Sequence, residues 1–132
     1  MNNGLEFENI IKAILRDIGW NVIDSNGRPV DVLAKLAGFT LLIECKDYPK
    51  STLAVQNDQL FVWRERRLVP VPLRGLTNAI AKTNPDKYIV VTSGKIENKY
   101  KDKYGKCEVI TYPYFKQWIH AFTNRVLNSV TM

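Results

Sequence analysis

The stretch VDVLAKLAGFTLLIECK, residues 30–46, contains the pattern that decides the fold. Two runs rich in Val, Leu and Ile, residues 30–35 and 39–46, lie on either side of Ala37-Gly38. Branched and aromatic side chains favour strands, and a glycine supplies the positive φ that a tight hairpin turn needs. We therefore predict a β-hairpin with a two-residue turn, in which Leu36 lies directly opposite Phe39.

This register brings three charged side chains to one face of the hairpin. Counting outward from the turn places Asp31 across from Glu44, and Lys46 follows Glu44 by two positions. Directly opposed residues have Cβ atoms about 5 Å apart, and residues two positions apart on a strand share a face. Opposed carboxylates cost stability, and a bound divalent cation removes that cost because hard cations prefer carboxylate oxygens.

Two carboxylates and a lysine at this spacing fit phosphodiester hydrolysis. The carboxylates can hold Mg²⁺ against a scissile phosphate, and the lysine can position or deprotonate the attacking water. The same residues also fit a surface hairpin that carries a Glu–Lys pair and an aspartate, because Glu-x-Lys is a common tripeptide. The hairpin alone leaves both interpretations open.

Residues 5–18, upstream of the hairpin, have the spacing of an amphipathic helix that ends near Gly19. At about 100° per residue, Glu8 lies closer to the apolar stripe than Glu6 does, so Glu8 can point toward the sheet while Glu6 faces water. An acidic residue also favours a helix N-terminus through the macrodipole, and this alternative stays open. The stripe consists of Phe7, Ile10, Ile11, Ile14, Leu15 and Ile18.

The rest of the chain alternates between strand-like and helical segments. We predict a strand over residues 20–23, a loop over 47–51 and a helix from about Ala54 to Arg67. Pro70 and Pro72 disfavour a helix or a central strand in the segment that follows. Farther along, the pattern predicts helices over 76–82, 96–104 and 114–127 and strands over 87–92 and 107–111.

This order of elements predicts an α/β fold, with a central mixed β-sheet flanked by helices and a single domain over residues 1–132. No apolar run is long enough to span a bilayer, and the N-terminus lacks the basic and then apolar pattern of a signal peptide. We therefore expect a cytoplasmic protein with no membrane partner.

Basic residues gather in two places along a chain whose net charge is +6. Lysine and arginine neutralise phosphates, and a basic chain is compatible with a polyanionic partner. A solvated surface explains each cluster equally well, so charge alone leaves the partner open. The candidate DNA-binding residues in the two clusters are Arg64, Arg66, Arg67, Lys95, Lys99, Lys101 and Lys103.

Four short segments occur in an order that is typical of one nuclease group. They are Phe7-Glu8 on the first helix, Gly19-Trp20 after it, Pro29-Val30-Asp31 on one strand and Ile43-Glu44-Cys45-Lys46 on the next. Together they resemble the PD-(D/E)XK superfamily, most closely its archaeal Holliday junction resolvases and Mrr-like restriction nucleases. The resemblance covers residues 4–60 and implies a restriction-endonuclease-like core. Val30 departs from the motif, in which proline and aspartate are adjacent.

The resemblance implies a role for each matching residue. Asp31 and Glu44 are expected to hold Mg²⁺, which Mn²⁺ can replace, with the Cys45 backbone carbonyl as a third ligand. Lys46 is expected to be the catalytic lysine. A glutamine on the following helix is also expected, and Gln59 matches it better than Gln56. The catalytic set that the resemblance implies is Glu8, Asp31, Glu44, Lys46 and Gln59.

We therefore expect a Mg²⁺-dependent DNA endonuclease. A length of 132 residues leaves no room for a separate sequence-recognition domain, which favours a structure-guided enzyme such as a Holliday junction resolvase. Such an enzyme is expected to be a homodimer, because two strands need two sites. An Mrr-like restriction-type or general DNA nuclease is the alternative. A catalytically idle DNA-binding subunit that keeps the fold is a second alternative.

Overall fold

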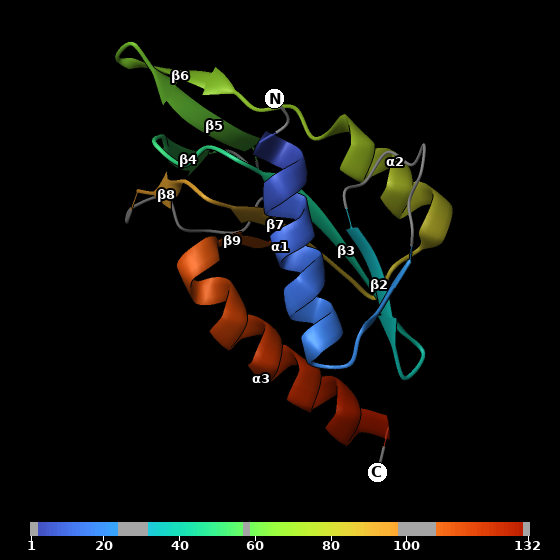
Figure 1. Ribbon diagram of the computed structural model, residues 1–132. Coiled ribbons are helices and arrows are strands. Elements are labelled where there is room, and N and C mark those ends of the chain that lie inside the picture. Colours follow the sequence, from blue (N-terminus) through green and yellow to red (C-terminus); the bar gives the residue numbers. More distant parts are fainter. Residues whose placement is uncertain (1–2, 24–31, 57–58, 98–107, 131–132) are drawn as a thin grey trace.

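The chain combines three described helices with two β-sheets and belongs to the α/β class (Figure 1). The computed structural model describes residues 3–23, 32–56, 59–97 and 108–130. In chain order, the described elements are α1 (Asn3–Asp17), β1 (Asn21–Ile23), β2 (Val32–Leu36), β3 (Phe39–Lys46), β4 (Thr52–Gln56), β5 (Gln59–Arg64), β6 (Arg67–Pro70), α2 (Arg74–Thr83), β7 (Lys87–Thr92), β8 (Lys95–Ile96), β9 (Glu108–Thr111) and α3 (Tyr112–Val130).

The hairpin of β2 and β3 forms in the predicted register. Leu36 pairs with Phe39, and the pairing continues outward to Val32 opposite Ile43. Both residues of the turn have positive φ, 50° at Ala37 and 82° at Gly38. Positive φ at both central positions defines a type I′ turn, whose twist matches that of the flanking strands. Local turn geometry therefore sets the register of the strand that carries Glu44 and Lys46.

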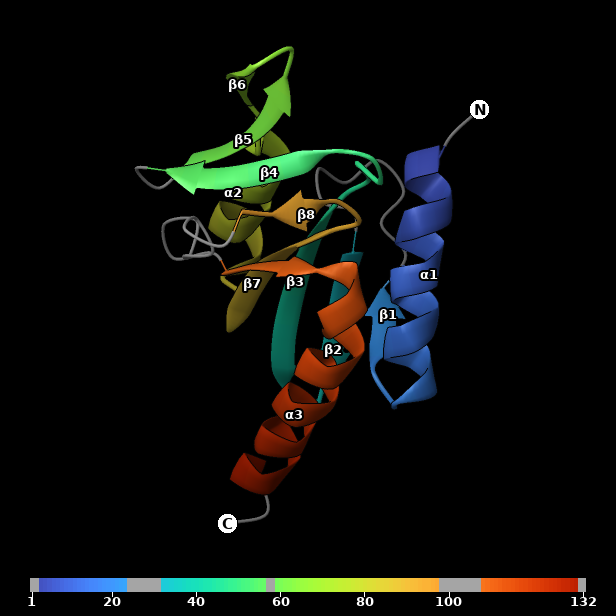
Figure 2. The same ribbon diagram turned by 90° about the vertical axis from the view of Figure 1, so that its left-hand side faces the viewer.

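The described strands form two mixed sheets. The first has the order β1-β2-β3-β7-β9, and β7 runs parallel to both β3 and β9. The second has the order β6-β5-β4-β8 and is built largely from the chain that connects β3 to β7. In Figures 1 and 2, β4, β5 and β6 lie beyond the end of the first sheet at which β3 finishes.

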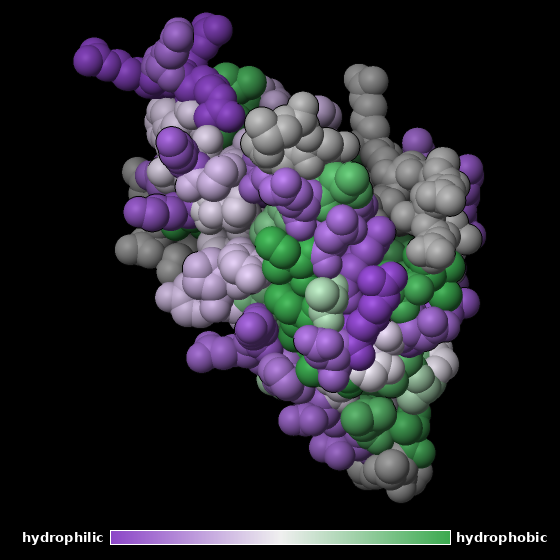
Figure 3. Space-filling view, in the orientation of Figure 1, coloured by the Kyte–Doolittle hydropathy of each residue, from purple (hydrophilic) through white to green (hydrophobic). Residues whose placement is uncertain are grey.

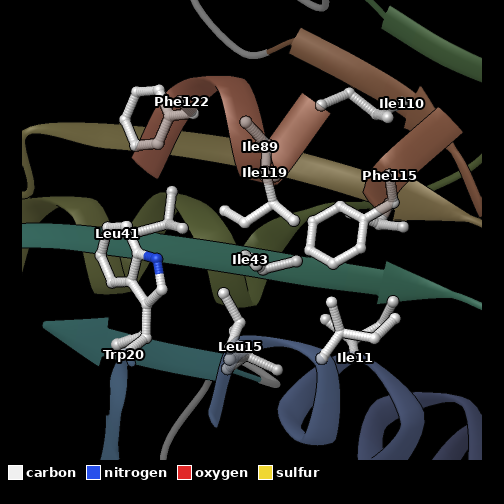
Figure 4. Close-up of a cluster of buried hydrophobic side chains, with 14 of the residues drawn as sticks. Ile11, Leu15, Trp20, Leu41, Ile43, Ile89, Ile110, Phe115, Ile119 and Phe122 are labelled. Atoms are coloured by element: carbon white, nitrogen blue, oxygen red, sulfur yellow. The ribbon is translucent and has the colours of Figure 1, made fainter. Parts of the chain in front are cut away.

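Each face of the first sheet is covered by its own apolar cluster. The first cluster lies under α1 and α3, where Ile11, Ile43 and Phe115 are completely buried (Figure 4). The second cluster lies between the opposite face, the second sheet and α2, and it contains Leu42 and Leu53. Figure 2 shows α1 and α2 on opposite sides of the first sheet. Successive residues of β3 therefore pack into different apolar clusters, as strand alternation requires.

Aromatic side chains pack α3 against the first cluster. Trp118 and Phe122 stack with ring centroids 4.9 Å apart, and Phe39 meets Phe122 edge to face at 5.3 Å. The Trp20 indole donates a buried hydrogen bond of 2.9 Å to the Thr123 hydroxyl. A buried indole N–H needs such a partner. Here the hydrogen bond connects the segment between α1 and β1 to α3.

Three predictions about local structure need correction. The segment from Ala54 to Arg67 is not a helix: it forms most of β4, all of β5 and the first residue of β6. Ile10 does not belong to the buried stripe of α1, because 44% of it is exposed. Ile96, the first residue of the predicted helix over 96–104, belongs instead to the short strand β8, and most of that predicted helix lies outside the described residues.

The other predicted elements are present with small shifts of their ends. The predicted helices over 5–18, 76–82 and 114–127 correspond to α1, α2 and α3. The prolines after residue 68 fall on or beside β6, an edge strand, where a missing N–H donor is tolerated. None of the helices that the structure describes is both long enough and apolar enough to cross a membrane.

Candidate active site

Glu44 and Lys46 lie on the same face of β3, near its carboxyl end. Leu42, two positions before Glu44, belongs to the second cluster, whereas Ile43 and Cys45 pack with the first cluster. Strand alternation therefore turns Glu44 and Lys46 toward the second sheet. The Oε2 atom of Glu44 lies 3.4 Å from the Nζ atom of Lys46. The two charged side chains form an ion pair.

This ion pair is largely removed from water. Only 8% of Glu44 is exposed, its Oε1 atom is buried, and the Lys46 side chain is 20% exposed. An ionised carboxylate in such a position is costly unless positive charge lies close to it. Lys46 supplies one such charge. A hard divalent cation would be a second suitable partner, because it prefers carboxylate oxygens and its attraction to a carboxylate is stronger where water is largely excluded.

Asp31, the other predicted metal ligand, lies outside the described residues. The pairing of Val32 with Ile43 agrees with the count that predicts Asp31 opposite Glu44. That opposition itself stays a prediction. Within the described part of the chain, no three His, Cys, Asp or Glu side chains gather as a metal site. Glu44 is therefore the one predicted carboxylate ligand whose position is known.

Glu8 has the predicted position on α1. Its side chain is 16% exposed and its Oε2 atom lies 3.9 Å from Lys12 Nζ, whereas Glu6 is exposed. Helical periodicity thus identified the more buried glutamate correctly. However, α1 packs on the first cluster, and Glu44 points from β3 toward the second. Glu8 therefore lies on a helix that covers one face of the first sheet, whereas Glu44 points from the opposite face. The catalytic role of Glu8 stays a prediction.

A network of hydrogen bonds holds the carboxyl end of β3. The Lys46 carbonyl accepts hydrogen bonds from the Thr92 hydroxyl at 2.8 Å and from the Ser93 amide at 3.2 Å. The Ser93 hydroxyl donates to an Asp47 carboxylate oxygen at 2.6 Å. Because β3 and β7 run parallel, their carboxyl ends meet and make these contacts. The sequence-based predictions do not include these residues, although Thr-Ser-Gly at the end of an apolar strand is a signal that could have found them.

Gly94 lets the loop over residues 47–51 approach the end of β7 closely, because it has no side chain. A Cβ atom there would lie 2.5 Å from Leu53 Cδ1 and 2.8 Å from the Tyr48 carbonyl oxygen. These distances are too short for real contacts, so residue 94 must be glycine for the loop over residues 47–51 to keep its place. The loop that follows Lys46 is thus packed directly on the turn between β7 and β8.

The predicted glutamines lie away from this loop. Gln59 begins β5, is exposed and pairs with Gln56 at the end of β4. The loop over 47–51 joins the other end of β4, and four residues of strand span roughly 13 Å. Neither glutamine lies on a helix. The assisting role predicted for Gln59 is untested, and its position gives that role no support.

The basic residues divide between two surfaces. Arg64, Arg66 and Arg67 are exposed at the tip of the β5–β6 hairpin. Lys95 lies on β8 and lines a cavity of about 550 Å³ together with Tyr114 and Trp118, beside β9 and α3. Lys99, Lys101 and Lys103 lie outside the described residues.

The structure brings together two of the predicted site residues, Glu44 and Lys46, with the Cys45 main chain between them. The Cys45 side chain packs with the first cluster, as strand alternation predicts. The ligand role of its carbonyl stays a prediction. No protein-family model, no curated protein and no solved structure matches this chain.

Proposed function

We propose that this protein is a divalent-metal-dependent endonuclease that hydrolyses DNA phosphodiester bonds at Glu44 and Lys46. One observation carries the proposal: the two side chains pair at 3.4 Å in a largely buried position on a central strand. The order of α1, an antiparallel β1–β2–β3 meander, α2 and a parallel β7 supports a restriction-endonuclease-like core for the first sheet.

The proposed chemistry assigns a task to each side chain. Glu44 and Asp31 would hold Mg²⁺, or Mn²⁺ in its place, with the Cys45 carbonyl as a further ligand. When bound, the cation supplies the positive charge that offsets the charge developing on the phosphate. Lys46 donates a hydrogen bond to the attacking water or to a phosphate oxygen, and Glu44 keeps its ammonium in place.

The proposed substrate is branched DNA, of the kind that Holliday junction resolvases cut. Symmetric cutting of a junction needs two sites, so the proposed active form is a cytoplasmic homodimer. An Mrr-like restriction-type or general DNA nuclease uses the same residues on other DNA, and a catalytically idle DNA-binding subunit would bind without cutting. These alternatives differ in which DNA is cut, if any.

A cleavage assay separates them. The protein is incubated with Mg²⁺ or Mn²⁺ and with plasmid, linear, single-stranded and four-way-junction DNA. We expect cleavage that chelation abolishes, with paired symmetric nicks on the junction. Glu44→Gln and Lys46→Met are each expected to reduce the rate by about 100-fold or more, the size of effect seen when a group that stabilises the transition state is removed.

Lys35→Met is the matched control, because Lys35 is exposed at the other end of the same hairpin. Its rate is expected to equal that of the natural sequence. Binding without cleavage under both metals would favour the idle subunit instead. Cleavage that survives both Glu44→Gln and Lys46→Met, with the fold intact by circular dichroism, would overturn the proposed site.

A further inference from the structure

Two arginines lie directly opposite each other on the β5–β6 hairpin. Arg64 pairs with Arg67 across the strands. Leu60 and Val62, four and two positions before Arg64, belong to the second apolar cluster, so Arg64 continues the inward face of β5. Arg67 shares that face because directly opposed residues do. Like charges in this arrangement destabilise a hairpin, and an anion between them removes the repulsion.

This arginine pair lies close to the loop that follows Lys46. The Arg64 Nη1 atom donates a hydrogen bond of 2.8 Å to the Ser51 hydroxyl, and its guanidinium lies 5.6 Å from the centroid of the Tyr48 ring. By strand alternation, Arg64 shares a face of β5 with Leu60 and Val62, and Lys46 shares a face of β3 with Leu42; these three apolar residues all belong to the second cluster. The hairpin arginines and the candidate active site therefore share one side and one end of the molecule.

The tip of the hairpin is itself in a disfavoured conformation. Glu65 has φ 49° and Arg66 has φ 70°. Asparagine and glycine are the residues that type I′ turns prefer, because other side chains crowd the backbone at positive φ. Strain of this kind gathers at functional sites. Figure 3 shows strongly hydrophilic side chains projecting from this region of the molecule.

We propose that the β5–β6 hairpin is the arm that holds the phosphate backbone of the DNA substrate. Arg64 and Arg67 contact one stretch of the backbone from the inward face, Arg66 extends the contact at the tip, and the arm directs the DNA toward Glu44 and Lys46. This inference rests on the proposed function. It explains why the hairpin keeps an opposed like-charge pair, since binding of a polyanion offsets the repulsion.

Arg67→Glu tests the arm because it replaces a repulsive pair by an attractive one. We expect the thermal midpoint Tm to rise by about 2–4 °C. Affinity for DNA is expected to fall by about 10-fold or more, with a salt dependence that is weaker by about one phosphate contact. A second variant, Glu65→Asn with Arg66→Gly, relieves the tip, and we expect it too to raise Tm and weaken DNA binding.

Lys116→Glu is the matched control, because it makes the same change of charge at an exposed position on α3, across the first sheet from the hairpin. Affinity, measured by fluorescence anisotropy over a salt series, is expected to change less than two-fold. If the Arg67→Glu variant binds DNA as tightly as this control does, the proposal of a DNA-binding arm is overturned, whereas the proposed nuclease function is not affected. An Arg67→Glu variant with both a lower Tm and a weaker affinity for DNA would show that Arg67 has a structural role instead. No DNA binding by the natural sequence would overturn both proposals.

Discussion

At the scale of single residues, Gly94 beside the candidate site is a position where a side chain has no room. Gly94→Ala would put a Cβ atom 2.8 Å from the Tyr48 carbonyl oxygen, a backbone atom that cannot move without moving its loop. We expect a loss of about 1–3 kcal/mol in the free energy of unfolding, measured in urea, together with slower DNA cleavage.

Gly38→Ala is the comparison for this change. A Cβ atom at Gly38 meets nothing within 4 Å, but φ is +82° there. We expect a cost of about 1–2 kcal/mol from backbone strain alone, with cleavage unaffected because the turn lies at the other end of β3 from Lys46. Equal effects of the two substitutions on cleavage would contradict the importance of the loop over 47–51.

The Thr92 hydroxyl is the second residue-scale test. Thr92 is completely buried, donates to the Lys46 carbonyl and accepts a hydrogen bond of 3.1 Å from the Gly94 amide. Thr92→Val leaves a buried amide without that acceptor, and we expect a loss of about 1–3 kcal/mol in denaturant titrations. Thr92→Ser keeps the hydroxyl and is expected to retain most of the stability. A valine variant as stable as the serine variant would contradict this role of the hydroxyl.

At the scale of elements, the β2–β3 turn can be improved without moving the site. Ala37 has φ 50°, a conformation that asparagine adopts more easily than alanine. We expect Ala37→Asn to raise the free energy of unfolding by about 1 kcal/mol, and to leave cleavage unchanged because the register of β3 stays the same. Thermal unfolding checks the first expectation and the cleavage assay the second. Slower DNA cleavage by this variant would contradict the expectation that the register is unchanged.

The same hairpin shows what sequence reasoning can predict. Its turn and its alternation are local signals, so they determined the pairing of Leu36 with Phe39 and put Glu44 and Lys46 on one face. Helical periodicity likewise separated the buried Glu8 from the exposed Glu6. Neither inference needed a contact between distant parts of the chain.

The error over residues 54–67 has the opposite cause. Four residues, Leu53, Val55, Leu60 and Val62, are the inward residues of β4 and β5. They are too few to mark a clear alternation, and the residues Arg64 to Arg67 that follow have good helix propensity. Strands this short depend on partners such as β6 and β8, which the local pattern does not reveal. The contact of Arg64 with the loop after Lys46 was missed for the same reason.

At the scale of the whole molecule, the two apolar clusters are expected to unfold together. Leu42 belongs to one cluster and Ile43 to the other, and both residues are completely buried on β3. Leu42→Ala and Ile43→Ala are each expected to cost about 2–5 kcal/mol. Because both cores share one strand, each variant should lower the stability of the entire domain in a single transition.

Tryptophan fluorescence can follow the two sides separately. Trp20 and Trp118 lie at the first cluster, and Trp63 lies on the second sheet. In variants that retain only one side's tryptophans, the unfolding curves are expected to coincide. Curves with different midpoints would show that the second sheet unfolds as a unit of its own.

The separation of β3 and β7 along the chain has a kinetic consequence. The two strands are neighbours in the sheet, yet residues 47–86 lie between Lys46 and Lys87. Closing so long a loop costs entropy before the parallel pairing is gained, whereas the β4–β5–β6 meander joins strands that are close in sequence. Early formation of that meander shortens the gap, so refolding speed should depend on the turn at Glu65 and Arg66, although neither residue belongs to the strands whose pairing it speeds.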